Sequence, residues 1–183
     1  MSDPRAERTR ARLRQALLEE CAEHPLEEVS VAALVRTAGL SRATFYLHYP
    51  DLRALAVDAC AEVVRDAVDA LHAWRGPAPA EPPPALTEFF TNLVPHAPLY
   101  RTLLRTGGSG PLGELLHREL REYSRRERML AGAPAADLIA SAVAGTFAGV
   151  LADWLHGLIE ADPPTMAHQV WRLLVALHRT PVG

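Results

Sequence analysis

The stretch "AGLSRATFYLHYPDLRAL" (residues 38–55) decides the fold of this 183-residue chain. Gly39 suits the left-handed backbone that ends a helix, and Ser41 is a preferred residue at a helix N-cap. Two short helices joined by such a glycine-containing turn are typical of a helix-turn-helix. At 100° per residue, Phe45 and Tyr49 fall on the side that packs against the preceding helices. The stretch therefore predicts a helical hairpin with one face turned outward.

The outward face of the second helix in this hairpin is mostly uncharged. The face and its flanks carry six side chains: Arg42, Ala43, Thr44, Tyr46, Leu47 and His48. A DNA major groove suits them, because arginine can fork onto guanine and apolar groups can contact thymine methyls. Hydroxyl and imidazole groups can bond phosphates and so fix the register. The alternative is an ordinary hairpin in which Tyr46 and Leu47 pack on a neighbouring element, and the pattern alone leaves both open.

Helical periodicity dominates the remaining chain, and no convincing run shows the alternation of a β-strand. The predicted helices cover residues 5–24, 30–38, 41–49, 50–74, 85–95, 97–106, 111–130, 134–158 and 164–179. The segment "RGPAPAEPPPA" (75–85) marks a linker, because its prolines cannot continue a helix. We expect an all-α fold of about nine helices, with an N-terminal three-helix unit (1–49) and a C-terminal bundle (50–183) connected through helix 50–74.

Charge is unevenly distributed along the chain. The composition is 49% hydrophobic and 22% charged, which is ordinary for a globular protein, and every cationic side chain is an arginine. The formal net charge is −3, yet residues 1–14 hold five arginines against two acids, so the rest of the chain carries −6. A basic arm on an acidic body favours local contact with a polyanion. The alternative for this arm is a solvated, frayed terminus.

Other functional classes lack positive support in the sequence. Cys21 and Cys60 lie within apolar helical patterns, which favours two buried reduced thiols in a cytosolic protein. The charged start argues against a signal peptide, and the longest uncharged run (138–152) is too short for a membrane helix. No HExxH, P-loop or GxSxG motif occurs, and the histidines are scattered. We therefore expect a cytoplasmic, non-enzymatic protein without metal, cofactor or membrane partner.

Residues 9–55 resemble the DNA-binding domain of TetR-family transcriptional regulators. The resemblance rests on "SVAAL" (30–34), "AGLS" (38–41), "TFYLHY" (44–49) and "LRAL" (52–55). It covers about the first third of the chain closely, whereas the rest matches only in helix count and length. The resemblance implies a homodimer that binds a palindromic double-stranded DNA operator and responds to a small-molecule effector. It also implies that the bundle is a ligand-binding and dimerisation domain.

The resemblance assigns roles to positions in the first two short helices. Arg42, Ala43 and Tyr46 match base-reading positions, while the residues beside them match positions that meet the backbone or adjacent bases. The full predicted DNA-binding set is Ser30, Val31, Arg36, Ser41, Arg42, Ala43, Thr44, Tyr46, Leu47 and His48. Leu52 departs from the pattern, because it replaces a lysine that ordinarily reaches phosphate. Val35 occupies a site usually held by alanine, which predicts slightly wider packing of the two helices.

Helix 134–158 supplies a candidate dimer surface, because a helix that is apolar nearly all round must be buried on both sides. Small residues in register let another helix approach closely. The predicted interface, which includes part of the last helix, is Ala140, Ala144, Gly145, Ala148, Gly149, Ala152, Val170, Leu174 and Leu177. The resemblance implies a four-helix bundle between two copies. The alternative is a monomer whose own helices cover the alanine stripe.

The middle helices offer candidates for the wall of an effector cavity, which in proteins is typically apolar with a few convergent polar groups. They are Phe89, Phe90, His96, Tyr100, Leu103, Leu116, His117, Leu120, Tyr123, Trp154 and His156. The alternative is that each of these side chains is simply part of the core. The sequence thus favours a repressor released from its operator by a small apolar or aromatic effector. The rival hypothesis is a TetR-like ligand-binding or scaffold protein that does not bind an operator.

Overall fold

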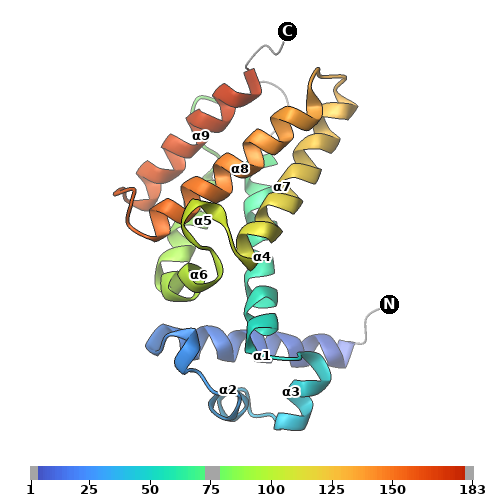
Figure 1. Cartoon of the computed structure of the whole chain (residues 1–183), viewed down its shortest axis with the longest axis vertical. Coiled ribbons are helices and arrows are strands. Elements are labelled where there is room, and N and C mark those ends of the chain that lie inside the picture. Colours follow the sequence, from blue (N-terminus) through green and yellow to red (C-terminus); the bar gives the residue numbers. More distant parts are fainter. Residues whose placement is uncertain (1–3, 73–78, 180–183) are drawn as a thin grey trace.

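A computed structural model of the chain describes residues 4–72 and 79–179, and within them every regular element is helical. The nine α-helices are α1 (Pro4–Glu23), α2 (Val31–Ala38), α3 (Arg42–His48), α4 (Leu52–His72), α5 (Pro84–Leu93), α6 (Ala97–Leu103), α7 (Pro111–Leu130), α8 (Ala136–Leu155) and α9 (Pro163–Arg179). Helices α1–α3 form a small head, and α4 leads from it into the larger bundle (Figure 1). The prediction of an all-α fold with about nine helices is confirmed.

The turn between α2 and α3 forms as the sequence predicts. The Ser30 hydroxyl caps α2 by accepting from the amide of Ala33 at 3.1 Å. Gly39 ends this helix with φ 62° and ψ 42°, a left-handed conformation that costs glycine little. The amide of Leu40 then reaches back 2.8 Å to the carbonyl of Val35, which completes a Schellman-type helix end.

The head has its own apolar core, to which all three of its helices contribute. Leu13 and Leu17 of α1, Leu34 of α2 and Phe45 of α3 are fully buried. Tyr49, just beyond α3, is also buried, and its ring lies 6.1 Å from that of Phe45. The inward side predicted for α3 is therefore confirmed. Its burial fixes which side of the helix faces solvent.

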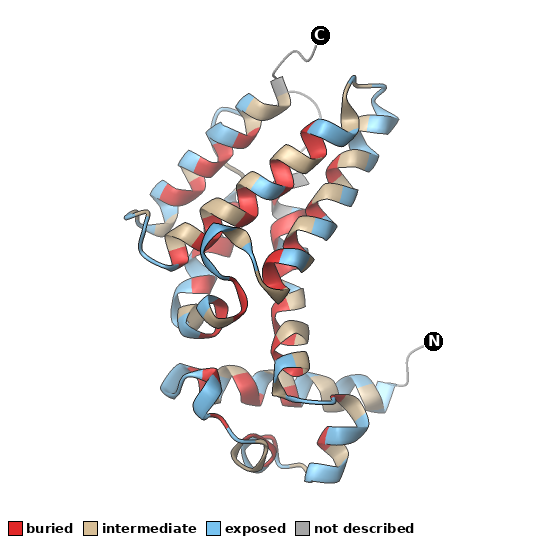
Figure 2. Cartoon of the chain, in the orientation of Figure 1, coloured by how far each residue is buried: buried red, intermediate tan, exposed pale blue. Residues whose placement is uncertain are grey.

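The bundle is organised around α8, which packs against α7 and α9 (Figures 1 and 2). An aromatic cluster fills the space toward α5, where the rings of Phe89 and Phe147 lie 5.9 Å apart. The rings of Phe90 and Trp154 meet edge to face at 5.2 Å. The indole of Trp154 donates to the carbonyl of Ala161 at 2.9 Å, so this polar group is satisfied where it is half-buried.

A close backbone approach joins α7 to the turn before it. A Cβ atom added to Gly113 would lie only 1.9 Å from the carbonyl oxygen of Gly108. Gly108 in turn has φ 78° and lies against the backbone of Ala148 in α8. These contacts explain why α6 ends at Leu103, short of the predicted 106: the chain becomes extended at Leu104 and enters this turn.

The linker prediction concerns a segment that is only partly described. Residues 75–78 lie outside the described residues, while 79–83 are non-helical and α5 begins at Pro84. Proline suits the first position of a helix, because the missing N–H has no intrahelical partner there. The predicted break before the fifth helix is therefore confirmed for its described part.

Helix α8 is, among the described residues, the one helix that is long and apolar enough to cross a membrane. Its 20 residues exceed the uncharged run counted from the sequence, because charged ends are tolerated in such a window. Half of its most apolar window is buried against the chain's own helices. Core helices of globular proteins meet the same criteria, and its packing between α7 and α9 identifies α8 as one of them.

Both cysteines are free and buried, as predicted. Burial, aided by the nearby carboxylates of Glu27 and Glu20, raises the pKa of the Cys21 thiol to about 11. Burial also raises the pKa of Cys60 well above its ordinary value. Since the thiolate is the reactive form of cysteine, both residues act here as small apolar side chains.

Candidate nucleic-acid interface

The outer face of α3 is open to solvent. Tyr46 is 59% exposed and Leu47 is 83% exposed, although both are large and partly or wholly apolar. Arg42 and Ala43 are exposed beside them, and the edge of the Tyr46 ring rests on Phe45 at 5.1 Å. No described part of the chain covers this face, so an ordinary packed hairpin does not account for it. Exposed apolar groups of this kind mark interaction surfaces.

The two serines in the predicted interface cap helices and still face solvent. The Ser30 and Ser41 hydroxyl oxygens each accept an amide hydrogen three residues ahead, at 3.1 and 3.0 Å. A hydroxyl that accepts in this way keeps its own O–H to donate. The Ser41 hydroxyl also lies 2.8 Å from that of Thr44, so one of these two O–H groups donates to the other and the second stays available to an external acceptor. Ser30 is thus placed to donate to an external oxygen while it caps α2.

Three arginines beside this face are uncommitted. They are Arg36 at the end of α2, Arg42 at the start of α3 and Arg53 in the first turn of α4. All three are exposed, and within the described part of the chain they form no hydrogen bond or ion pair. Arginines of this kind suit phosphate and guanine, whose oxygens accept the paired N–H groups of a guanidinium.

Two arginines of the predicted basic arm have structural roles instead. Arg12 donates to the carbonyl of Ala38 at 2.6 Å and so holds the C-terminus of α2. Arg14 is largely buried and contacts Glu7, Asp58 and Glu62 at 2.9, 3.1 and 3.2 Å. Burial disfavours its charged form, but the bonds to Glu7 and Asp58 outweigh this and raise the pKa of Arg14 above its ordinary value. These two arginines of the predicted basic arm are therefore engaged within the chain itself.

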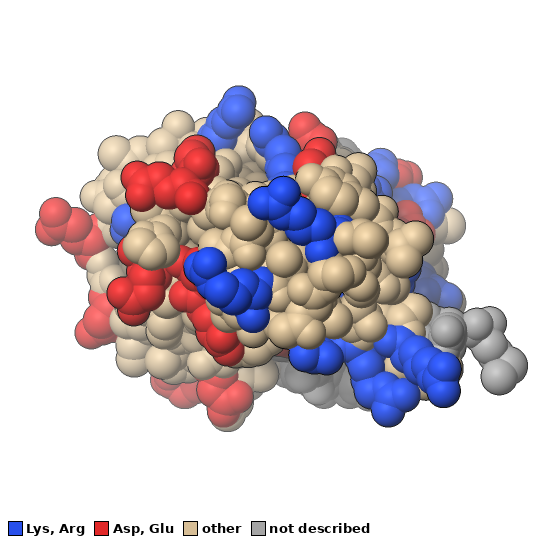
Figure 3. All heavy atoms as spheres, turned by 90° about the horizontal axis from the view of Figure 1, so that it is seen from below, with Lys and Arg blue, Asp and Glu red and all other residues tan. Residues whose placement is uncertain are grey.

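Charge divides the lower surface of the head into two sides (Figure 3). Acidic groups gather on one side, whereas arginines lie along the side of the N-terminus and also extend into the otherwise uncharged central area. The exposed acids of the head include Glu19, Glu23, Glu27 and Glu28, which lie at the end of α1 and in the following turn. A polyanion would therefore meet an attractive and a repulsive side on one surface.

The position of Leu52 removes one phosphate contact that the family pattern would lead us to expect. Leu52 is half-buried and packs against the apolar core, so its side chain joins the head to α4. Arg53 is exposed at the next position and faces a different direction on the helix. Val35 is buried at the predicted crossing of the head helices.

A polar contact missed by sequence reasoning ties the end of α3 to α4. The Tyr49 hydroxyl donates to the carboxylate of Asp58, which also accepts from Arg14. Burial and this hydrogen bond raise the pKa of Tyr49 above its ordinary value, so the hydroxyl stays protonated at neutral pH. No sequence signal links these residues, because the contact depends on how α1, α3 and α4 pack together.

Most of the predicted dimer residues are buried within a single copy of the chain. The four alanines of the α8 stripe, with Val170 and Leu174 of α9, are buried inside the chain itself. Helix α7 and the turn at 106–108 cover the alanine stripe, since small side chains let these elements approach α8 closely. Gly145 is exposed, and Gly149 and Leu177 are half-buried, so these three remain available to a second copy.

The predicted cavity residues are mostly core. Six of them are buried: Phe89, Phe90, Tyr100, Leu103, Leu116 and Leu120. His96, His117, Tyr123 and Trp154 are half-buried, while His156 is exposed and its imidazole bonds the Leu104 carbonyl at 2.9 Å. Two surface grooves of the described chain include only Phe89 and Tyr123 from this set. The single shared cavity stays a prediction.

Comparison with known proteins bears on the head and on the whole fold separately. Residues 13–59 match the model of bacterial regulatory proteins of the tetR family. No match to curated proteins was found. A tetR-family transcriptional regulator from Streptomyces coelicolor is similar in structure, with TM-score 0.62 and 21% identity, covering 97% of this chain and 82% of that one.

Two further solved structures have the same fold. FadR from Bacillus subtilis, crystallised with stearoyl-CoA, has TM-score 0.59 and 17% identity and covers 91% of this chain and 97% of its own. NalD, a secondary repressor of a multidrug efflux pump in Pseudomonas aeruginosa, has TM-score 0.55 and 18% identity, covering 93% and 95%. At these identities the likeness concerns the fold.

Proposed function

We propose that the chain, which carries the N-terminal domain of tetR-family regulatory proteins, is a sequence-specific DNA-binding repressor. The all-helical fold that it shares with solved regulators of this family supports the proposal. The observation that carries the proposal is the outer face of α3. Tyr46 and Leu47 are exposed there beside an uncommitted arginine, Arg42. A short helix with this face uppermost fits a major groove, where arginine reads guanine and apolar groups contact thymine.

The proposal includes a homodimer, because one short helix reads too few base pairs to bind tightly. We place the contact between the two copies on the exposed side of α8 and the neighbouring α9, because the alanine stripe is buried within each copy. Leu138 is 60% exposed on α8 and Leu173 is 42% exposed on α9. Two copies joined here would present two recognition helices to one pseudo-palindromic site.

Helix α4 supports a mechanism of release. It contacts α1 in the head, and within the bundle it packs against α5 and α7. A small apolar or aromatic effector that binds one arrangement of the bundle more tightly would shift the population toward it, and α4 would move the heads out of register. The stearoyl-CoA complex of the similar FadR supports the view that this fold holds apolar effectors, and NalD supports the role of repressor.

The test is selection of bound sequences from a random double-stranded DNA library, followed by gel shifts across a salt series. A repressor that contacts phosphates loses affinity steeply with salt, with a log–log slope near −0.9 for each phosphate. Replacing Arg42 by Ala is expected to cost about 1–3 kcal/mol on the selected site and to relax base preference at one position. Arg126→Ala on α7 is the control, because this exposed arginine lies on the bundle rather than on the head.

The rival function, a ligand-binding or scaffold protein without operator binding, has one observation in its favour. Leu52 is committed to packing and supplies no phosphate contact. Under this alternative the selection would return no enriched sequence, and the weak binding that remains would be the same for Arg42→Ala and Arg126→Ala.

A further inference from the structure

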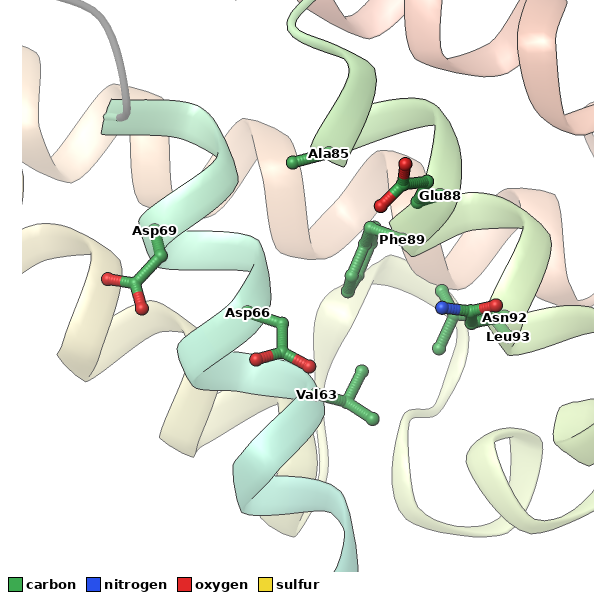
Figure 4. A pocket seen from close by; sticks show the side chains of 8 residues that line it. All are labelled: Val63, Asp66, Asp69, Ala85, Glu88, Phe89, Asn92 and Leu93. Atoms are coloured by element: carbon green, nitrogen blue, oxygen red, sulfur yellow. The ribbon is translucent and has the colours of Figure 1, made fainter.

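A groove on the surface of the bundle lies between α4 and α5 (Figure 4). Its volume is about 320 Å³, which falls at the lower end of the range for small-molecule sites. Six of its lining residues are Val63, Asp66 and Asp69 from α4 and Glu88, Phe89 and Asn92 from α5. They recur every three or four residues on each helix, so the groove is formed by two facing helix surfaces.

The floor of the groove is apolar and firmly supported. The ring of Phe89 lies between the two helices and is only 4% exposed. It contacts the rings of Phe90 at 5.3 Å and Phe147 at 5.9 Å, so it belongs to the aromatic cluster of the bundle. Val63 adds a half-buried aliphatic surface from α4. A hydrocarbon group that covered this floor would be desolvated against a rigid surface.

The rim of the groove is acidic. Asp66, Asp69 and Glu88 are exposed, and within the described residues none of them forms a hydrogen bond or an ion pair. None of the residues that line the groove is basic. Asp69 also borders a neighbouring groove that Arg65 and Arg126 line, whereas Asp66 and Glu88 belong to this groove alone of the two. The like charges of Asp66 and Glu88 repel each other, and a bound positive charge would relieve this repulsion. Asn92 on the same rim adds an amide oxygen that can accept a hydrogen bond.

The spacing of these carboxylates argues against a metal ion as the bound cation. Among the described residues, no group of three or more His, Cys, Asp or Glu side chains is arranged to hold a metal. A charge carried on a longer molecule suits the groove better, because the acids are spread over two helices while the floor between them is apolar.

We propose that the groove between α4 and α5 binds a small organic cation, an alkyl or arylalkyl amine. Its ammonium group lies between the carboxylates of Asp66 and Glu88, and its hydrocarbon part covers Val63 and Phe89. This site is distinct from the cavity predicted from the sequence, with which it shares only Phe89. An effect of the amine on operator binding, transmitted through α4, rests on the proposed function. Binding of the amine to the groove does not depend on that function.

The test is isothermal titration calorimetry of the full chain with three probes of equal chain length. Octylamine is positively charged at neutral pH, octan-1-ol is neutral and octanoate is negatively charged. We expect measurable binding of octylamine, with affinity at least tenfold above that of octan-1-ol, and no binding of octanoate. Equal affinity for octylamine and octan-1-ol would overturn the proposal, because charge would then have no role.

The variant Asp66→Asn with Glu88→Gln removes two rim charges and keeps the shape of the groove. The matched control is Glu127→Gln with Glu160→Gln, which changes the net charge equally at exposed sites away from the groove. We expect octylamine affinity to fall about fivefold or more in the groove variant and to stay within twofold in the control. If both variants lost octylamine affinity equally, the amine would be attracted by the overall negative charge of the protein, and the proposed groove site would be overturned. Octylamine binding without operator binding would leave this inference intact and contradict only the proposed function.

Discussion

Tyr49 and Asp58 join the end of α3 to α4: the Tyr49 hydroxyl donates to the Asp58 carboxylate, which Arg14 of α1 also contacts at 3.1 Å. One carboxylate thus holds three helices together where the head meets the bundle. Tyr49 is buried and Asp58 is partly buried, so breaking the contact would leave polar groups with limited access to water. We therefore expect movement of α4 to change the orientation of α3.

Replacement of Tyr49 by Phe tests this contact. The ring and its packing on Phe45 remain, and only the hydroxyl is lost, so we expect a loss of about 1–3 kcal/mol in the free energy of unfolding. Tyr46→Phe is the control, because the Tyr46 hydroxyl makes no hydrogen bond to described residues. The free energy of unfolding of this variant should equal that of the wild type. Urea denaturation measures both. Equal stabilities for the two variants would contradict the structural role of the Tyr49 hydroxyl.

The turn between α2 and α3 gives a second prediction. Gly39 has φ 62°, and an added Cβ would lie 2.9 Å from the guanidinium of Arg12. Gly39→Ala should lower the free energy of unfolding by about 1–2 kcal/mol because of the left-handed backbone conformation, and by a further amount because the methyl group displaces the Arg12 cap. Gly132→Ala shares the backbone cost, with φ 63°, but its Cβ would meet nothing within 4 Å. The difference between their unfolding free energies measures the Arg12 contact, and a zero difference would show that Arg12 adds no stability.

The close approach at Gly113 predicts a larger effect. A methyl group there would overlap the carbonyl of Gly108, a backbone atom that cannot rotate away, so Gly113→Ala should destabilise the bundle by about 3 kcal/mol or more. Gly145→Ala serves as the comparison, because its Cβ would meet only His117 at 4.0 Å and alanine favours a helix by about 1 kcal/mol. Thermal unfolding should show the first variant melting lower than the wild type and the second no lower.

The oligomeric state tests the proposed dimer surface. Leu138→Glu combined with Leu173→Glu places two charges on the exposed side of α8 and α9, and it should convert a dimer into a monomer. Val94→Glu with Leu158→Glu is the control, since these residues are equally exposed but lie outside the two helix faces. Light scattering after size-exclusion chromatography measures the mass. A dimer that survives the first pair would require another interface.

Local signals in the sequence were sufficient for most of the head. Ser30, Gly39 and Ser41 begin and end helices through contacts within a few residues, so their roles are readable from the sequence. The outward face of α3 followed from periodicity once Phe45 and Tyr49 were assigned to the core. The helix boundaries that shifted, such as the end of α6, lie where a tertiary contact stops the helix.

Contacts between distant segments explain what the sequence did not predict. The alanine stripe of α8 has the composition of a helix–helix interface, and it is buried within the chain itself, where α8 packs against α7. Arg12 and Arg14 looked like members of a basic arm because their partners, Ala38 and Asp58, are 26 and 44 residues away. The groove between α4 and α5 escaped detection because its acids, taken singly, read as solvated surface.

Under the proposed function, the division of charge across the head affects how the protein would search for DNA. Residues 1–49 contain seven arginines and seven carboxylates, so this unit is neutral overall while carrying a strong electric dipole. A head without net charge adds little long-range attraction to nucleic acid, so its affinity would depend on the contacts made at the arginine-bearing edge. The dipole turns each encounter so that the arginine-bearing edge arrives first, which favours productive orientations at moderate salt.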